Sequence, residues 1–122
     1  MSIDRDGFVY EMNPLSYQVR KYGPEGVLIK TFTNPAAGDV GDPRKVHEFL
    51  NGPFCLDDGV IVIQRKGCLD LFDSDGRLIT SGILAAQRVI YVSRNDLYFE
   101  VSDEGDTEKT LNPRLVCYRL RN

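Results

Sequence analysis

The side chains in this sequence that are able to do chemistry are few. There are three cysteines, Cys55, Cys68 and Cys117, and one histidine, His47. A cysteine–histidine nucleophile pair requires the two side chains to be adjacent and the thiol pKa to be lowered, and the sequence supports neither. Cys68 and Cys117 lie in apolar runs, which is typical of buried thiols. Because the cysteine count is odd and no CxxC spacing occurs, the sequence predicts neither a disulfide framework nor a zinc site.

Paired carboxylates also occur, but they lie in turns. Asp57 and Asp58 are adjacent, and Asp73 and Asp75 belong to an Asp-x-Asp-Gly segment. Acid–base catalysis needs two carboxylates that face each other across a cleft, and an EF-hand calcium loop needs a later glycine and a closing glutamate. The sequence also contains no Gly-x-Ser-x-Gly, His-Glu-x-x-His or phosphate-binding glycine loop. We therefore expect no catalytic residue, no metal site and no cofactor.

The composition narrows the choice of partners. The 122 residues include 15 Lys and Arg against 18 Asp and Glu, a net charge of −3, which argues against nucleic acid or an anionic membrane as a partner. The longest apolar runs, Val60–Ile63 and Ile83–Ala86, are too short to cross a bilayer. Residues 2–6 are polar where a signal peptide is apolar. We expect a cytoplasmic protein as written, and a secreted or periplasmic one if an N-terminal segment is missing.

The elements that must position these side chains are mostly strands. One short helix is predicted over Asp42–Leu50, because Asp42 suits the N-cap, Pro43 the first helical position and Gly52 the position after the last turn. Elsewhere, runs rich in β-branched and aromatic residues alternate with turns that contain Gly and Asp. The nine predicted strands are 8–10, 18–22, 27–32, 60–64, 69–72, 78–80, 88–92, 97–101 and 115–120. The sequence thus predicts one all-β domain with a single short helix.

An internal repeat organises these strands. Residues 22–31 align without gaps on residues 72–81, and each copy is an aromatic residue, a turn ending in glycine and an apolar strand. A looser third copy has Tyr118 in the aromatic position. The spacing suits the antiparallel blade of a β-propeller. We expect blades over 2–33, 54–84 and 85–122, with 34–53 as a linker that holds the helix.

The first blade carries a resemblance to a known family. Its residues 4–10 (Asp-Arg-Asp-Gly-Phe-Val-Tyr) and 18–32 (Gln-Val-Arg-Lys-Tyr-Gly-Pro-Glu-Gly-Val-Leu-Ile-Lys-Thr-Phe) resemble the blade signature of NHL-type six-bladed β-propellers. The resemblance also covers 57–82 and part of 88–121. It implies half of a propeller, or a propeller fragment, that binds through loops on one face of the ring or at its central channel. The long linker, the acidic insertion at 102–107 and the missing outer strand of the third unit depart from the family pattern.

Three blades do not close a ring, so their edges and apolar faces invite further pairing. We favour two interpretations. Either two copies form a six-bladed homodimer, or the chain is a fragment of a longer propeller. Closure of the strands into a small β-barrel or sandwich is the alternative.

The expected function is that of a non-catalytic binding or scaffold module that completes its fold by oligomerisation, with a protein or small molecule as ligand. A propeller-type hydrolase fragment and a monomeric adaptor that binds a partner strand at its sheet edge are the alternatives. Arg65, Lys66 and Arg94 together would form a small anion site, and the acidic loop 103–106 would attract a cation or a basic partner. The candidate contacts are loop residues without an evident packing role: Tyr17, Arg65, Lys66, Arg94, Asn95 and Arg114.

Overall fold

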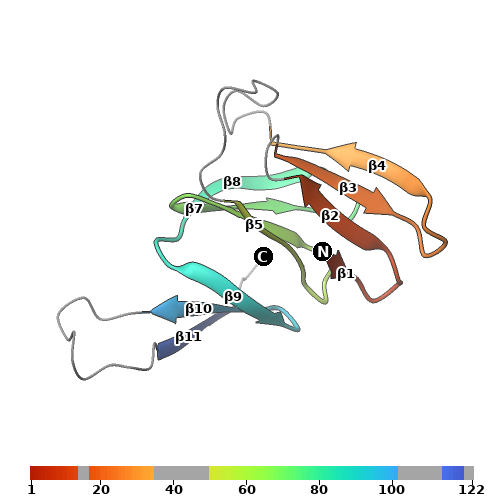
Figure 1. The fold of residues 1–122 in the computed structure, drawn as a ribbon. Helices are drawn as coiled ribbons and strands as arrows, with labels where there is room; N and C mark the ends of the chain where they lie inside the picture. Colours follow the sequence, from red (N-terminus) through yellow and green to blue (C-terminus); the bar gives the residue numbers. More distant parts are fainter. Residues whose placement is uncertain (14–16, 35–49, 102–113, 120–122) are drawn as a thin grey trace.

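The computed structural model describes residues 1–13, 17–34, 50–101 and 114–119, which form three antiparallel sheets (Figure 1). The expected all-β fold is therefore confirmed. The first sheet contains β1 (Ser2–Ile3), β2 (Val9–Asn13), β3 (Gln18–Tyr22) and β4 (Leu28–Phe32), in that order. The second contains β5 (Leu50–Cys55), β6 (Ile61–Arg65), β7 (Cys68–Phe72) and β8 (Leu78–Leu84), again in that order. In the third, β10 (Asp96–Val101) lies between β9 (Arg88–Ser93) and β11 (Arg114–Arg119).

The nine predicted strands are confirmed, with shifts at their ends, but the region around Gly52 is not as expected. The predicted helix Asp42–Leu50 lies outside the described residues except for Leu50, which begins β5 instead. The second sheet therefore starts inside the expected linker, and the described residues contain no helix. Gly52 has a φ of 121°, and a Cβ atom there would lie 2.9 Å from the carbonyl oxygen of Val62. Gly52 is thus required where β5 bends across β6 and does not terminate a helix.

Two of the hairpin turns are closed by the carboxylate of the aspartate that opens them. The Oδ1 atom of Asp73 accepts hydrogen bonds from the backbone N–H groups of Asp75 and Arg77, both at 2.9 Å. Asp4 accepts the same two bonds from residues 6 and 8. Gly76 supplies the positive φ (82°) that such a turn needs. The Asp-x-Asp-Gly segments are therefore hairpin turns, as predicted.

The three sheets stack face to face, with the second sheet in the middle (Figure 1). Alternate residues of a strand point to opposite faces, and β6 is buried from Ile61 to Gln64, so both faces of the second sheet are covered. We call its contact with the first sheet the first seam and its contact with the third sheet the second seam. The buried apolar residues of the first seam are Tyr10, Tyr17, Val19, Phe32, Ile61, Ile63 and Phe72. Those of the second seam are Leu56, Val60, Val62, Leu69, Leu71, Val89, Leu97 and Phe99.

The sequence repeat is also a repeat of register. The second and third strands of the first and second sheets are aligned by the pairs Val9–Tyr22 and Ile61–Phe72, and the matching pair of the third sheet is Leu97–Tyr118. The first strands of the sheets, β1, β5 and β9, are neighbours across the stack. Stacked sheets with adjacent first strands are common to propellers and to layered sandwiches. Within the ranges described, the chain forms no helix able to traverse a membrane.

Candidate functional site

Two of the predicted contact residues meet on a buried carboxylate in the first seam. Tyr17 directly precedes β3 and has no exposed surface, and its hydroxyl donates a 2.6 Å hydrogen bond to Oδ2 of Asp70 on β7. Arg65, at the end of β6, donates from Nε to Oδ2 (2.7 Å) and from Nη2 to Oδ1 (3.1 Å). The expectation that Tyr17 has no packing role is therefore wrong. Tyr17 joins the first sheet to the second and presents no surface to a ligand.

The fourth strands of both sheets complete this polar cluster. The backbone N–H of Gly82 on β8 donates to Oδ1 of Asp70 (3.1 Å), and the Ser81 hydroxyl donates to the same atom (3.3 Å). Asn34, which follows β4 and is fully buried, donates from Nδ2 to the Ser81 Oγ (2.8 Å). The cluster thus connects the two sheets at the end of the first seam where β3 and β7 begin.

The electrostatics of the cluster follow from burial and from the donors around Asp70. Burial disfavours the Asp70 carboxylate, but the hydrogen bonds from Arg65 and Tyr17 outweigh this cost, so the pKa of Asp70 lies below its usual value. For Tyr17, burial raises the pKa of the phenol, and the hydrogen bond to Asp70 raises it further. At neutral pH the cluster therefore contains one guanidinium, one carboxylate and one neutral phenol. This is a charge-balanced structural element and not an activated acid or base.

The other predicted contacts do not join this cluster. Arg94 lies in the turn between β9 and β10, where its carbonyl oxygen accepts a 2.9 Å hydrogen bond from the N–H of Asp57. The Oδ1 atom of Asn95 accepts from the N–H of Asp58 (3.0 Å). Both residues therefore lie beside the turn that leads into β6, whereas Arg65 is at the opposite end of that strand. The expected anion site of Arg65, Lys66 and Arg94 is not assembled.

The remaining sequence candidates are placed only in part. Lys66 is exposed and lines a shallow groove together with Gly67 and Arg88. Arg114 begins β11 opposite Val101. His47 and the acidic loop 103–106 lie outside the described residues.

The cysteines are free thiols. Cys55 and Cys68 are partly exposed, and Cys117 is exposed, so the expectation of buried thiols at Cys68 and Cys117 is wrong. Burial raises the pKa of the Cys55 thiol. Among the described residues no three His, Cys, Asp or Glu side chains come close enough together to hold a metal ion.

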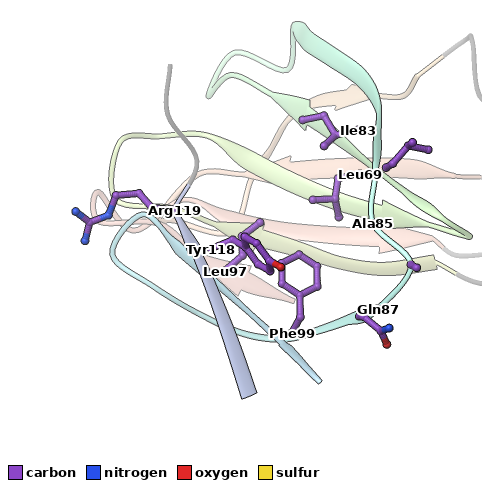
Figure 2. Close-up of a pocket in the computed structure, with 10 residues that line it drawn as sticks. Leu69, Ile83, Ala85, Gln87, Leu97, Phe99, Tyr118 and Arg119 are labelled. Atoms are coloured by element: carbon purple, nitrogen blue, oxygen red, sulfur yellow. The ribbon is translucent and has the colours of Figure 1, made fainter. Parts of the chain in front are cut away.

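An apolar pocket lies at the second seam (Figure 2). Its volume is about 390 Å³, in the range of small ligand sites. The rings of Phe99 and Tyr118 meet edge to face within it, with centroids 5.4 Å apart. Arg119 extends away from the two rings and pairs with Asp96 at 2.8 Å. The lining residues are Leu69, Ile83, Leu84, Ala85, Ala86, Gln87, Leu97, Phe99, Tyr118 and Arg119.

Sequence reasoning missed Asp70 and the pocket. A lone Asp between two leucines reads as solvent-facing in a half-buried strand, and only the coverage of both faces of the second sheet makes it internal. The pocket draws its lining from four separate segments of the chain, so no local motif encodes it. Comparison with models of known protein families and with curated proteins finds no match for this chain, and its function must be argued from this geometry.

Proposed function

We propose that the chain is a non-catalytic binding or scaffold module that completes a β-propeller by self-association, with two copies forming a ring of six sheets. One observation carries the proposal. The outward faces of the first and third sheets carry apolar residues at register positions whose counterparts in the second sheet pack against its neighbours. In a two-fold ring, the third sheet of each copy would cover the first sheet of the other.

The outward face of the third sheet matches the packed face of the second. Three of its residues occupy register positions whose counterparts lie in the second seam. The outward residues are Tyr91, Tyr98 and Cys117, and the counterparts are Phe54, Val62 and Leu71. Tyr91 is 60% exposed, and its ring lies 5.6 Å from that of Tyr98. Tyr98 is half-buried, so the pair presents mainly the Tyr91 ring to solvent, and burial of that ring against another surface is favoured.

The outward face of the first sheet matches the other side of the second sheet in the same way. Val9 and Tyr22 have Ile61 and Phe72 as counterparts, and these two pack in the first seam. Ile3, paired with Val9, is 60% exposed, and Leu28, paired with Tyr22, is 51% exposed. The outward faces of the first and third sheets therefore present apolar positions like those that meet inside the chain, whereas Glu11 and Arg20 occupy the positions of Ile63 and Asp70.

The turn carboxylates support a binding role without catalysis. Asp4, Asp58 and Asp73 each accept hydrogen bonds from the backbone of their own turns. Asp70 is engaged inside the first seam. A general base must reach a proton of the substrate, whereas these groups are already occupied by structural donors.

Light scattering of the purified protein tests the proposal. Two copies give twice the 13.8 kDa of one chain, with a monomer–dimer equilibrium on dilution. A monodisperse species of 13.8 kDa at all concentrations would contradict the ring.

A further inference from the structure

The two seams differ at equivalent positions, and in the second seam this position lies in the groove of Lys66, Gly67 and Arg88, which shares residues 85–87 with the pocket. Tyr17 directly precedes β3 and Gly67 directly precedes β7, and both have a positive φ, 45° and 79°. In the first seam the Tyr17 side chain fills the space between the sheets and reaches Asp70. In the second seam, Gly67 has no side chain to place in the equivalent space, and a Cβ atom built there meets no heavy atom within 4 Å.

A fourth strand closes the first seam but not the second. In the first seam, β8 lies beside β7 and directs Ser81 and Gly82 at Asp70. Val116 is the counterpart of Asp70 in the third sheet. Ile63 pairs with Asp70 in the second sheet, and Phe99 pairs with Val116 at the same register position of the third. Within the described residues, however, the third sheet ends at β11, which pairs only with β10. Among the ranges that the structure describes, one edge of β11 thus has no strand partner for its backbone donors and acceptors next to the pocket.

The pocket continues an interface that already exists. Leu69, Leu97 and Phe99 belong both to its lining and to the buried core of the second seam. At its rim, Leu84 is 91% exposed and Tyr118 is 58% exposed. A strand added to β11 would cover these apolar groups as β8 covers the end of the first seam.

We infer that the free edge of β11 binds an extended peptide segment of a partner protein, which pairs with β11 as a fourth strand and places an aromatic side chain in the pocket. Backbone pairing supplies affinity, and the pocket supplies specificity, because only alternate side chains of a strand point toward it. In the first seam, Ser81 of the fourth strand contacts the charged Asp70. In the second seam, the corresponding side chain of the added strand would contact Val116 and Tyr118, so we expect it to be apolar. This inference rests on the proposed role as a binding module but not on self-association.

The strand that closes the first seam supplies a suitable probe. A labelled peptide with the sequence of residues 76–84 of this chain and the change Ser81→Phe is titrated with the full-length protein, and binding is followed by fluorescence anisotropy. We expect saturable binding, weakened by about tenfold or more when the same peptide carries Ser81→Asp. Backbone N-methylation of the peptide, which removes donors to β11, abolishes binding.

Two protein variants localise the site. Leu84→Glu places a charge at the exposed rim of the pocket. Gly67→Tyr places a ring in the adjoining groove, which shares residues 85–87 with the pocket. Each variant weakens binding by about tenfold or more. The control is Ile79→Glu, at a 49% exposed position outside the pocket lining, which binds as the wild type does.

Three outcomes would overturn the inference. The first is no saturation at peptide concentrations on the order of 1 mM, and the second is binding that is insensitive to Leu84→Glu. The third is a Leu84-dependent increase of mass beyond two copies, which would assign the edge to another copy of this chain. Because mass and peptide binding are measured separately, a monomer that binds the peptide rejects the ring alone, and a dimer that does not bind it rejects the peptide site alone.

Discussion

Asp70 is a charged side chain with no exposed surface. Its two oxygens accept hydrogen bonds from Arg65, Tyr17, Ser81 and the backbone of residue 82. A buried ion pair of this kind contributes little net stability compared with apolar packing, but removal of one partner is costly because the other stays buried and unbalanced. The cluster therefore fixes the position of the first sheet on the second more than it strengthens the contact.

Asp70→Asn should lower the free energy of unfolding by roughly 2–4 kcal/mol, because Arg65 loses its counter-charge and Tyr17 its charged acceptor. Urea unfolding monitored by circular dichroism measures the change. The pKa of Asp70 is lowered in the folded state. The stability that the ionised Asp70 contributes is therefore present above about pH 4 and is lost as the pH falls below that value. The variant should accordingly lose less stability on acidification than the wild type. Asp75→Asn, in an exposed turn, is the control and should change stability by less than about 0.5 kcal/mol.

Tyr17 makes the same seam sensitive to alkali. Its pKa is raised in the folded protein, first by burial and then by the hydrogen bond to Asp70. The folded state therefore favours the neutral phenol, and the contribution of Tyr17 to stability is constant below about pH 10 and declines as the pH rises above it. Tyr17→Phe should be less stable at neutral pH by about 1–3 kcal/mol but should show a shallower alkaline decline. Urea midpoints measured from neutral to alkaline pH test this, and equal slopes for the two proteins would contradict it.

At the scale of elements, the sequence predicts strands and turns well and their packing poorly. Gln18–Tyr22 is predicted to the residue, because alternation and the following glycine turn are local signals. Leu50–Cys55 is missed, since Gly52 suits the position after a helix when the neighbouring strand β6 is unknown. The candidate contacts fail for a related reason: Tyr17 is conspicuous in the sequence, but only the stacking of two sheets shows that it is internal.

Two glycine turns test how closely the first sheet packs on the second. Gly26 and Gly76 occupy equivalent turn positions with φ of 86° and 82°. A Cβ atom at Gly26 meets nothing within 4 Å, whereas one at Gly76 would lie 2.7 Å from Cδ1 of Phe32, whose ring is 5.0 Å from that of Phe72. Gly26→Ala should cost about 1 kcal/mol of backbone strain. Gly76→Ala should cost roughly 2–3 kcal/mol, because Phe32 must also move. Thermal unfolding of the two variants gives the difference, and equal losses would place the Phe32 ring away from that turn.

At the scale of the whole molecule, the chain is a stack with two unlike ends. Among the described residues, the second sheet is covered on both faces, while the first and third are each covered on one. Because the sheets stack in the same sense, the ring we propose would bring each outward face against the other kind of face and not against a copy of itself. A head-to-tail contact of this kind either closes into a ring or continues as a filament. Each outward face also carries one ion pair, Glu11–Arg20 at 3.3 Å and Asp96–Arg119 at 2.8 Å.

The proposed ring therefore makes a prediction that a symmetric face-to-face dimer does not. Ile3→Glu alters the first-sheet face and Tyr91→Glu the third-sheet face, both at 60% exposed positions, so each variant alone should fold and run at the 13.8 kDa of one chain. When the two variants are mixed, one of the two contacts in the ring joins unaltered faces, and dimers should reappear in light scattering with reduced affinity. Ile79→Glu, on the second sheet, should dimerise as the wild type does. If only one of the two outward faces proves sensitive to substitution, the copies pair like face to like face, and a head-to-tail ring is contradicted.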